Sequence, residues 1–187
     1  MLSGAPIILP AAATQEVREY LRIVGQEEQQ LLERLTLGAV ELCEQFTGRI
    51  LIARSFTELV GGGKGSAQPF PGSWRRLGAT PVTVISGVET VSSAGSASTL
   101  EPGSYAVDID ANGDGWVRIT ALVAPQRIRV TFEAGMASAW AQLPEALKQG
   151  VVRLAAHLYT HRDDAEGAGP PAAVTALWRP WRRLRLH

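Results

Sequence analysis

The segment DIDANGDGW, residues 108–116, has the residue types and spacing that could bind a calcium ion. Asp108, Asp110 and Asn112 stand at alternate positions and a glycine follows, as at the start of an EF-hand loop. The twelfth position of such a loop holds a bidentate glutamate, but here it is Ile119. Asn-Gly and Asp-Gly pairs also favour tight hairpin turns. We therefore expect a β-hairpin here, and weak binding of a divalent ion by the same residues stays open.

A second pattern that could bind a metal is the pair His157 and His161, four residues apart. This spacing can place two imidazoles on one ion when the residues are helical. A zinc site needs at least a third ligand, and the HExxH arrangement is missing because Leu158 and Tyr159 follow the first histidine. We expect these histidines to flank the apolar stripe of a helix rather than to bind metal.

The sequence contains no set of residues typical of catalysis. Cys43 is expected to be a buried small hydrophobic residue, because the first 156 residues contain no histidine that could act as its base. The serines lack a G-x-S-x-G elbow, and GGGKG at 61–65 lacks the spacing of a phosphate-binding loop. We predict a protein that is not an enzyme and has no cofactor and no metal site.

The size and composition of the chain set further limits. A chain of 187 residues is long enough to bury the core of one domain. The single cysteine excludes an internal disulfide. No apolar run approaches the ~20 residues that a membrane-spanning helix needs, so we expect no membrane partner.

The charges of the chain balance overall but are separated along the sequence. Eighteen basic and eighteen acidic residues give a formal net charge of zero, which argues against a dedicated nucleic-acid coat protein. Residues 14–47 carry seven glutamates and three arginines, whereas the last ten residues carry four arginines and no acid. Such separation suits head-to-tail or ring association, in which an acidic face meets a basic one. Two solvated surfaces that never meet are the alternative.

Hydrophobic periodicity predicts an α+β fold with helices on both sides of a β-rich region. A helical hairpin is expected over residues 14–47, where apolar residues recur at helical spacing on both sides of Gly25. A long later helix is expected over residues 144–162, and Pro144 suits its first turn. Residues 50–134 hold short β-branched runs separated by turn residues, which predict an inserted antiparallel β module.

The remaining segments are expected to lie outside these elements. Residues 1–13 are rich in alanine and proline and predict a flexible N-terminal arm. Glycine and serine predict loops within 61–78 and 92–103, whose roles the sequence leaves open. A single domain over residues 14–169 would then be followed by an extended C-terminal docking tail, residues 170–187.

The end of that tail, WRPWRRLRLH, is the strongest candidate for a partner-binding site. Tryptophan contributes buried area and arginine contributes forked hydrogen bonding, and both types dominate interface hot spots. Contact with nucleic acid and packing of the tail on its own domain are the alternatives. The predicted partner-binding residues are Leu177, Trp178, Arg179, Trp181, Arg182, Arg183 and Arg185.

Four further segments carry a family resemblance. They are EQFTGRIL (44–51), ATPVTVISGVETV (79–91), VTFEAGM (130–136) and LPEALKQGVVRLAAHLYTHRD (143–163). Together they resemble the head–tail connector family (adaptor, or head-completion, proteins) of tailed bacteriophages and of phage-derived gene transfer agents. The last segment is the closest match and is similar to the final helix of the family. The loops of the β-rich region and its acidic hairpin depart from the family pattern.

The resemblance implies a non-enzymatic structural virion protein, assembled in the bacterial cytoplasm. Its copies would form a ring, typically a dodecamer, at the head–tail interface of a phage or gene transfer agent particle. Its partners would be the portal protein, a tail stopper or tail-terminator protein and neighbouring copies, with DNA passing through the lumen without sequence-specific binding. Which face contacts the portal stays open. The alternative function is a β-rich ligand- or calcium-binding module on a helical scaffold.

Overall fold

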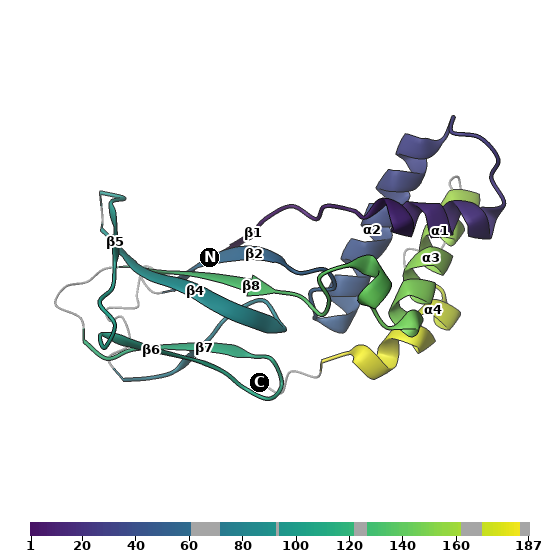
Figure 1. The fold of residues 1–187 in the computed structure, drawn as a ribbon. Helices are drawn as coiled ribbons and strands as arrows, with labels where there is room; N and C mark the ends of the chain where they lie inside the picture. Colours follow the sequence, from purple (N-terminus) through teal and green to yellow (C-terminus); the bar gives the residue numbers. More distant parts are fainter. Residues whose placement is uncertain (61–71, 93, 122–126, 162–169, 184–187) are drawn as a thin grey trace. The chain divides into compact units, whose positions relative to one another are not determined.

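The computed structural model describes residues 1–60, 72–92, 94–121, 127–161 and 170–183. The chain divides into two compact units. The β unit consists of Met1–Pro6 and Ala53–Gly135, and the helical unit consists of Ile7–Ile52 and Met136–His187. The predicted α+β class is confirmed (Figure 1).

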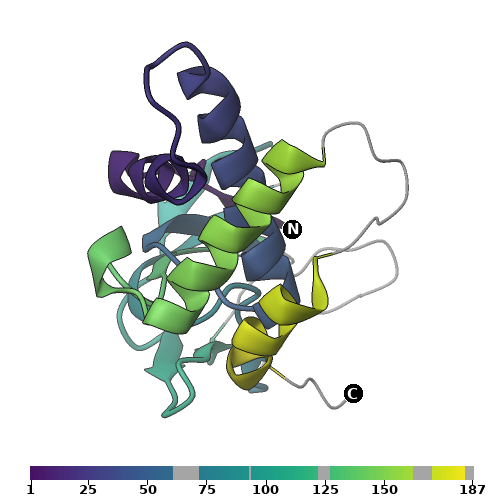
Figure 2. The same cartoon turned by 90° about the vertical axis from the view of Figure 1, so that its right-hand side faces the viewer.

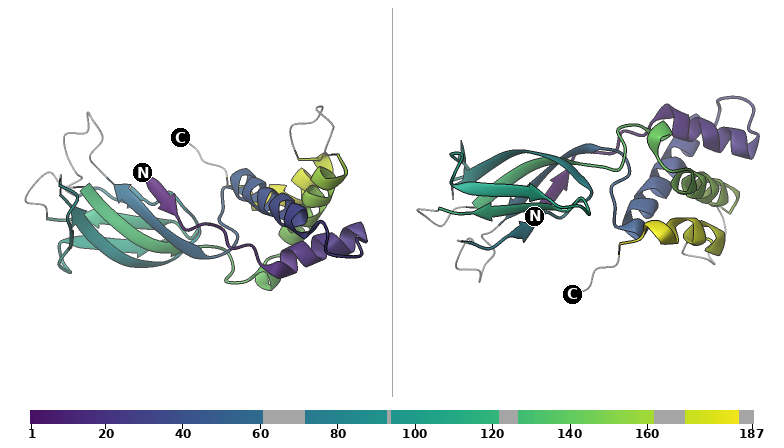
Figure 3. Two further views of the ribbon diagram at one scale, coloured as in Figure 1. Left: turned by 90° about the horizontal axis from the view of Figure 1, so that it is seen from above. Right: turned by 60° about the horizontal axis from the view of Figure 1, so that its bottom comes forward.

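Two antiparallel sheets lie one over the other in the β unit (Figures 1 and 3). The larger sheet has the strand order β1-β2-β8-β4-β5, and the smaller has the order β3-β7-β6. The strands are β1 (Leu2–Gly4), β2 (Arg54–Val60), β3 (Arg75–Arg76), β4 (Val82–Val91), β5 (Ala97–Thr99), β6 (Tyr105–Ile109), β7 (Gly115–Ile119) and β8 (Arg127–Ala134).

Alternating burial along the strands builds the core of the β unit. Val117 and Ile119 are buried on β7, and Val130 and Phe132 are buried on β8, while the residues between them are more exposed. This period of two is expected when only one face of each sheet is covered. Phe56 lies directly opposite Phe132 across the β2–β8 pair, and the two rings stack with their centroids 5.7 Å apart.

In the described part of the helical unit, four α-helices pack around a second core. Its elements are α1 (Ala11–Leu21), α2 (Gln29–Thr47), the 3₁₀ turn η1 (Trp140–Gln142), α3 (Glu145–Thr160), α4 (Ala172–Trp178) and the 3₁₀ turn η2 (Arg179–Trp181). Buried residues recur every three or four positions, as in Leu32, Thr36, Ala39 and Cys43 of α2. This spacing places them on one face of the helix, which packs against α3.

The long predicted helices are present, with boundaries set by local residues. The first helix begins at Ala11 after Pro10 rather than at Thr14. The second ends at Gly48, whose φ of 67° is the left-handed conformation that terminates many helices. The third begins directly after Pro144, as expected.

Residues 2–4, predicted to belong to a flexible arm, form β1 on the edge of the larger sheet. The Leu59 N–H donates to the Met1 carbonyl oxygen at 2.9 Å, and the Ala5 N–H donates to the Ser55 carbonyl oxygen at 2.9 Å. Backbone hydrogen bonds to β2 hold this segment. A strand of three residues is too short to show an alternation of apolar and polar residues, so the sequence does not predict it.

Three other short elements also differ from the predicted loops and tail. Strands β3 and β5 lie within the segments 61–78 and 92–103, of which residues 61–71 and 93 are outside the described part of the chain. The helix α4 and the turn η2 occupy much of the predicted extended tail. Val174 and Trp178 are four residues apart on α4 and both are buried, so packing stabilises a helix that is short on its own.

Candidate interaction site at the C-terminal end of the helical unit

The Trp178 side chain lies in the core of the helical unit. Its exposed fraction is 0%, and its ring centroid is 5.8 Å from that of Phe46. The indole Nε1–H donates to the carbonyl oxygen of Leu147 at 3.4 Å. A Cβ atom at Gly150 would overlap the indole nitrogen and lie 2.7 Å from its Cδ1 atom. Glycine at position 150 therefore leaves the space on α3 that the indole fills.

This burial corrects the predicted role of Trp178 as a side chain that a partner contacts. The indole has no surface left for a partner, because it is enclosed by its own unit. The sequence also allowed the alternative that the tail packs against its own domain. The structure shows this packing for Trp178. The signal that sequence reasoning missed is Gly150, since glycine inside a helix is unfavourable unless close packing requires it.

Residues 181–183 cross the end of α2 and bind the corner Thr47–Gly48–Arg49. The Arg183 N–H donates to the Thr47 carbonyl oxygen at 2.9 Å, and Arg49 Nε–H donates to the Trp181 carbonyl oxygen at 3.1 Å. The Arg182 guanidinium lies over the Phe46 ring, 5.7 Å from its centroid. These contacts give Arg182 and Arg183 a fixed position on the helical unit.

The other predicted partner-binding residues keep some or all of their surface. Arg179 and Arg182 are exposed, whereas Leu177, Trp181 and Arg183 are half-buried. Their contact with a partner stays a prediction. Arg185 lies outside the described residues.

A groove of about 400 Å³ between α1 and α3 is lined by Lys148, the single lysine in the sequence of this unit. The Lys148 Nζ atom lies 2.6 Å from Glu145 Oε1, and only 8% of the residue is exposed. The hydrogen bond to Glu145 raises the pKa of Lys148, although burial acts in the opposite direction. Across the groove, Trp140 Nε1–H donates to Glu16 Oε1 at 2.9 Å.

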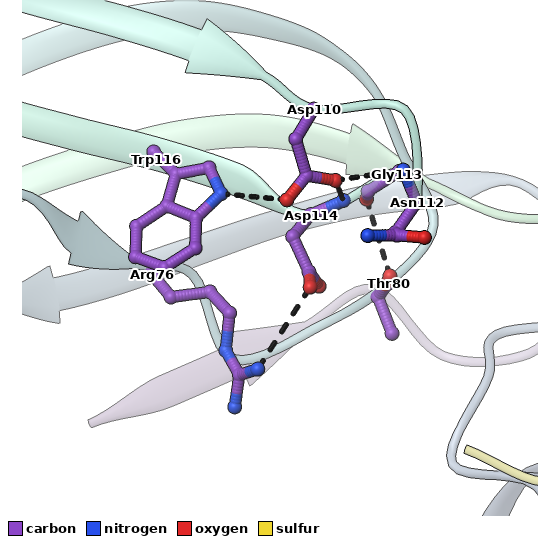
Figure 4. A network of polar contacts seen from close by, with 7 residues as sticks. All are labelled: Arg76, Thr80, Asp110, Asn112, Gly113, Asp114 and Trp116. Carbon is purple, nitrogen blue, oxygen red and sulfur yellow. Dashed lines mark hydrogen bonds and ion pairs between the residues drawn. The ribbon is translucent and has the colours of Figure 1, made fainter. Parts of the chain in front are cut away.

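In the β unit, residues 108–116 form the predicted hairpin, with β6 and β7 antiparallel. The Asp110 carboxylate organises the turn (Figure 4). Its Oδ1 atom accepts the N–H groups of Asn112 and Asp114 at 2.8 and 2.9 Å, and its Oδ2 atom accepts the indole N–H of Trp116 at 3.1 Å. Both carboxylate oxygens of Asp110 thus accept hydrogen bonds from within the hairpin. This geometry gives no support to the alternative that the segment binds calcium.

The same turn packs on the start of β4. Thr80 Oγ1–H donates to the Gly113 carbonyl oxygen at 3.1 Å, and Arg76 Nη1 lies 3.8 Å from Asp114 Oδ2 (Figure 4). Gly113 has a φ of 75°, and a Cβ atom there would lie 2.7 Å from Pro81 Cβ. The hairpin is therefore a structural corner of the β unit.

Replacing Asp110 with asparagine should lower the free energy of unfolding of the β unit by about 1–3 kcal/mol. Asparagine keeps one acceptor oxygen but turns an NH₂ group toward the Trp116 indole N–H, so that hydrogen bond is lost. Urea denaturation would measure the change. The control is Asp108→Asn, at an exposed position of β6. Equal stability of the two variants would contradict the role given to Asp110.

The other candidate residues show no arrangement for chemistry. Cys43 is fully buried, and burial raises the pKa of its thiol, so the thiol stays protonated as expected for a core residue. The rings of His157 and His161 lie 4.2 Å apart at the end of α3. Within the described ranges, no three His, Cys, Asp or Glu side chains are grouped to hold a metal ion. No helix among those ranges is long and apolar enough to span a membrane.

No protein-family model and no curated protein matches the sequence. Solved structures do match, each over 100% of this chain and 97% of the matched chain. One match comes from the neck of an empty GTA (gene transfer agent) particle computed with C6 symmetry, with a TM-score of 0.80 and 24% identity. A second comes from the virion of a native gene transfer agent particle, with a TM-score of 0.75 and 26% identity. A third comes from the neck of a native GTA particle computed with C12 symmetry, with a TM-score of 0.76 and 25% identity.

The predicted likeness to head–tail connector proteins is confirmed. The matches cover 100% of the chain, so the likeness is not limited to the four segments that carry it in the sequence. The likeness therefore covers both units. The contact between Gly150 and Trp178 and the segment bound to Thr47–Gly48–Arg49 belong to the helical unit.

Proposed function

We propose that this connector is a structural virion protein that forms a ring between the portal and the tail of a phage-like particle. The likeness over the full length to chains of a native gene transfer agent virion and of its C12 neck is the observation that carries the proposal. The ring would join the head to a tail stopper or tail-terminator protein. DNA would pass through its lumen without sequence-specific binding, and the chain would act without catalysis.

The charge distribution supports a ring. In a cyclic ring every copy contacts its two neighbours through two different surfaces, because the contact is head to tail. The chain carries an excess of acid on residues 14–47 and an excess of base on its last ten residues. Twelve copies would match the symmetry reported for the neck structure.

The exposed arginines of the C-terminal end are the proposed contacts to the portal or to a neighbouring copy. Arg179 and Arg182 are exposed, and Leu177, Trp181 and Arg183, which stand next to them in the sequence or within two residues, are half-buried. A truncation before Trp178 would remove a core side chain. A loss of tail attachment could then result either from unfolding of the unit or from the loss of a contact to a partner. Substitutions of the exposed arginines are therefore the informative variants.

Deleting the gene in cells that produce the particles should give filled heads without attached tails. Supplying the wild-type gene in trans should restore tailed particles, counted by negative-stain electron microscopy. The Arg179→Glu/Arg182→Glu variant should fold normally but restore few tails, whereas Arg153→Glu, an exposed site on α3, should restore them. Complete, tailed particles in the absence of the chain would contradict the proposed function.

A further inference from the structure

We infer that the groove between α1 and α3 receives the basic C-terminal end of the helical unit of a second copy. This inference rests on the proposed function, since it names the two surfaces through which neighbouring copies of the ring would meet. We call the first surface the α1–α3 groove and the second the basic end. The lining of the groove includes Glu16, Glu19, Tyr20, Glu145, Lys148 and Val152.

The α1–α3 groove has the chemistry of an arginine-binding surface. Of its three carboxylates, Glu145 is paired with Lys148, so Glu16 and Glu19 leave a net negative charge. Glu19 is exposed, and its Oε1 atom accepts a hydrogen bond from the Gln15 side chain at 2.9 Å. Tyr20, which lines the groove with these carboxylates, is 55% exposed. Carboxylates bind the guanidinium fork, and an aromatic face stacks on its plane.

The basic end presents the matching groups. Arg179 and Arg182 are exposed there, and Arg49 lies beside them through its hydrogen bond to the Trp181 carbonyl oxygen. The acid at this end of α2 is Glu44, whose Oε1 atom accepts the Leu51 N–H at 2.9 Å and so faces its own backbone. The fixed position of residues 181–183 means that little side-chain and backbone freedom is lost on binding.

The two surfaces lie on opposite sides of the helical unit, as a head-to-tail contact requires. At about 100° per residue, the groove positions 145, 148 and 152 of α3 fall roughly opposite Gly150 and Leu147, which contact Trp178 of α4. Figure 2 shows α1 and α4 on either side of α3. One copy could therefore bind a neighbour at each surface, which produces a ring or a helical chain rather than a closed dimer.

The test is a disulfide between neighbouring copies in assembled particles. The Glu19→Cys/Arg182→Cys double variant places one thiol on each surface, and the native Cys43 gives little background because it is buried. Mild oxidation of purified particles should give a ladder of covalent oligomers from dimer up to the whole ring, read on a non-reducing gel. Either single variant, or the pair Glu41→Cys/Arg182→Cys with its first thiol on the exposed face of α2, should give no ladder.

Charge reversal provides a second readout. Glu19→Arg and Arg182→Glu should each reduce incorporation of the chain into particles about tenfold or more, because like charges then meet at every contact. The double variant should regain incorporation because each contact again joins opposite charges. A mixture of the two single variants should also regain it, because every contact joins opposite charges when the two variants alternate around the ring. A wild-type chain that is absent from particles would overturn the proposed function itself. A chain that is incorporated but gives no ladder, or reversals without mutual rescue, would overturn only the groove contact.

Discussion

Replacing Trp178 with alanine should lower the free energy of unfolding of the helical unit by about 3–5 kcal/mol, the range for large aromatic residues removed from a core. The indole is fully buried between Phe46 and the Gly150 surface of α3. Its removal leaves a cavity that the backbone of α3 and α4 cannot close without moving. Val174 would then be the one buried side chain left on α4, so α4 should detach from the core.

The measurement is chemical denaturation followed by the helical circular dichroism signal, which reports mainly on this unit. The control is Trp181→Ala, at a half-buried position three residues further on. Its smaller buried area predicts a smaller loss, about 1–2 kcal/mol. If the two alanine variants lose the same free energy of unfolding, Trp178 is not the residue that anchors the C-terminal end.

The parts of the fold that the sequence predicts well are long and periodic. In α2 and α3 a single apolar stripe runs for many residues, and β4 and β8 hold β-branched runs bounded by turns. The hairpin over residues 108–116 is also predictable, because its turn chemistry is local. Short elements such as β1, β3 and α4 carry too few residues for a period, and they form because a neighbouring strand or helix supplies the contacts.

The candidate site was predictable in composition but not in geometry. Tryptophan and arginine at the C-terminus indicate an interaction segment, but the sequence does not reveal which of them faces the solvent. Trp178 is buried because Gly150, twenty-eight residues earlier, leaves room for it. That pairing depends on how α4 packs on α3, which no local pattern encodes.

The two residue types at this end therefore lie in different places: Trp178 is in the core, whereas Arg179 and Arg182 are exposed and stay the proposed contacts to a partner. Trp178 holds α4 to the core, and hydrogen bonds to the corner 47–49 fix residues 181–183 in place. Arg179 and Arg182 are left at the surface with little freedom to lose. A rigid basic surface binds an acidic neighbour at a lower entropic cost than a flexible tail would.

Substituting alanine for each of two helical glycines should have opposite effects, and this contrast tests the packing of Trp178 most directly. Gly150→Ala should destabilise the helical unit by about 1–3 kcal/mol, because the new methyl group overlaps the indole. Gly38→Ala in α2 should instead stabilise it by about 0.5–1 kcal/mol, because no atom lies within 4 Å of a Cβ there and alanine favours the helix. Urea midpoints of the two variants measure both effects.

The double variant Gly150→Ala/Trp178→Ala separates overlap with the indole from any other effect of the glycine substitution. Once the indole is absent, the methyl group at position 150 meets open space, so Gly150→Ala should change from destabilising to neutral or slightly stabilising. The coupling free energy between the two sites should then be about 1–3 kcal/mol, equal to the cost of overpacking. Additive effects of the two substitutions would mean that Gly150 serves another purpose and that the position of α4 depends on other contacts.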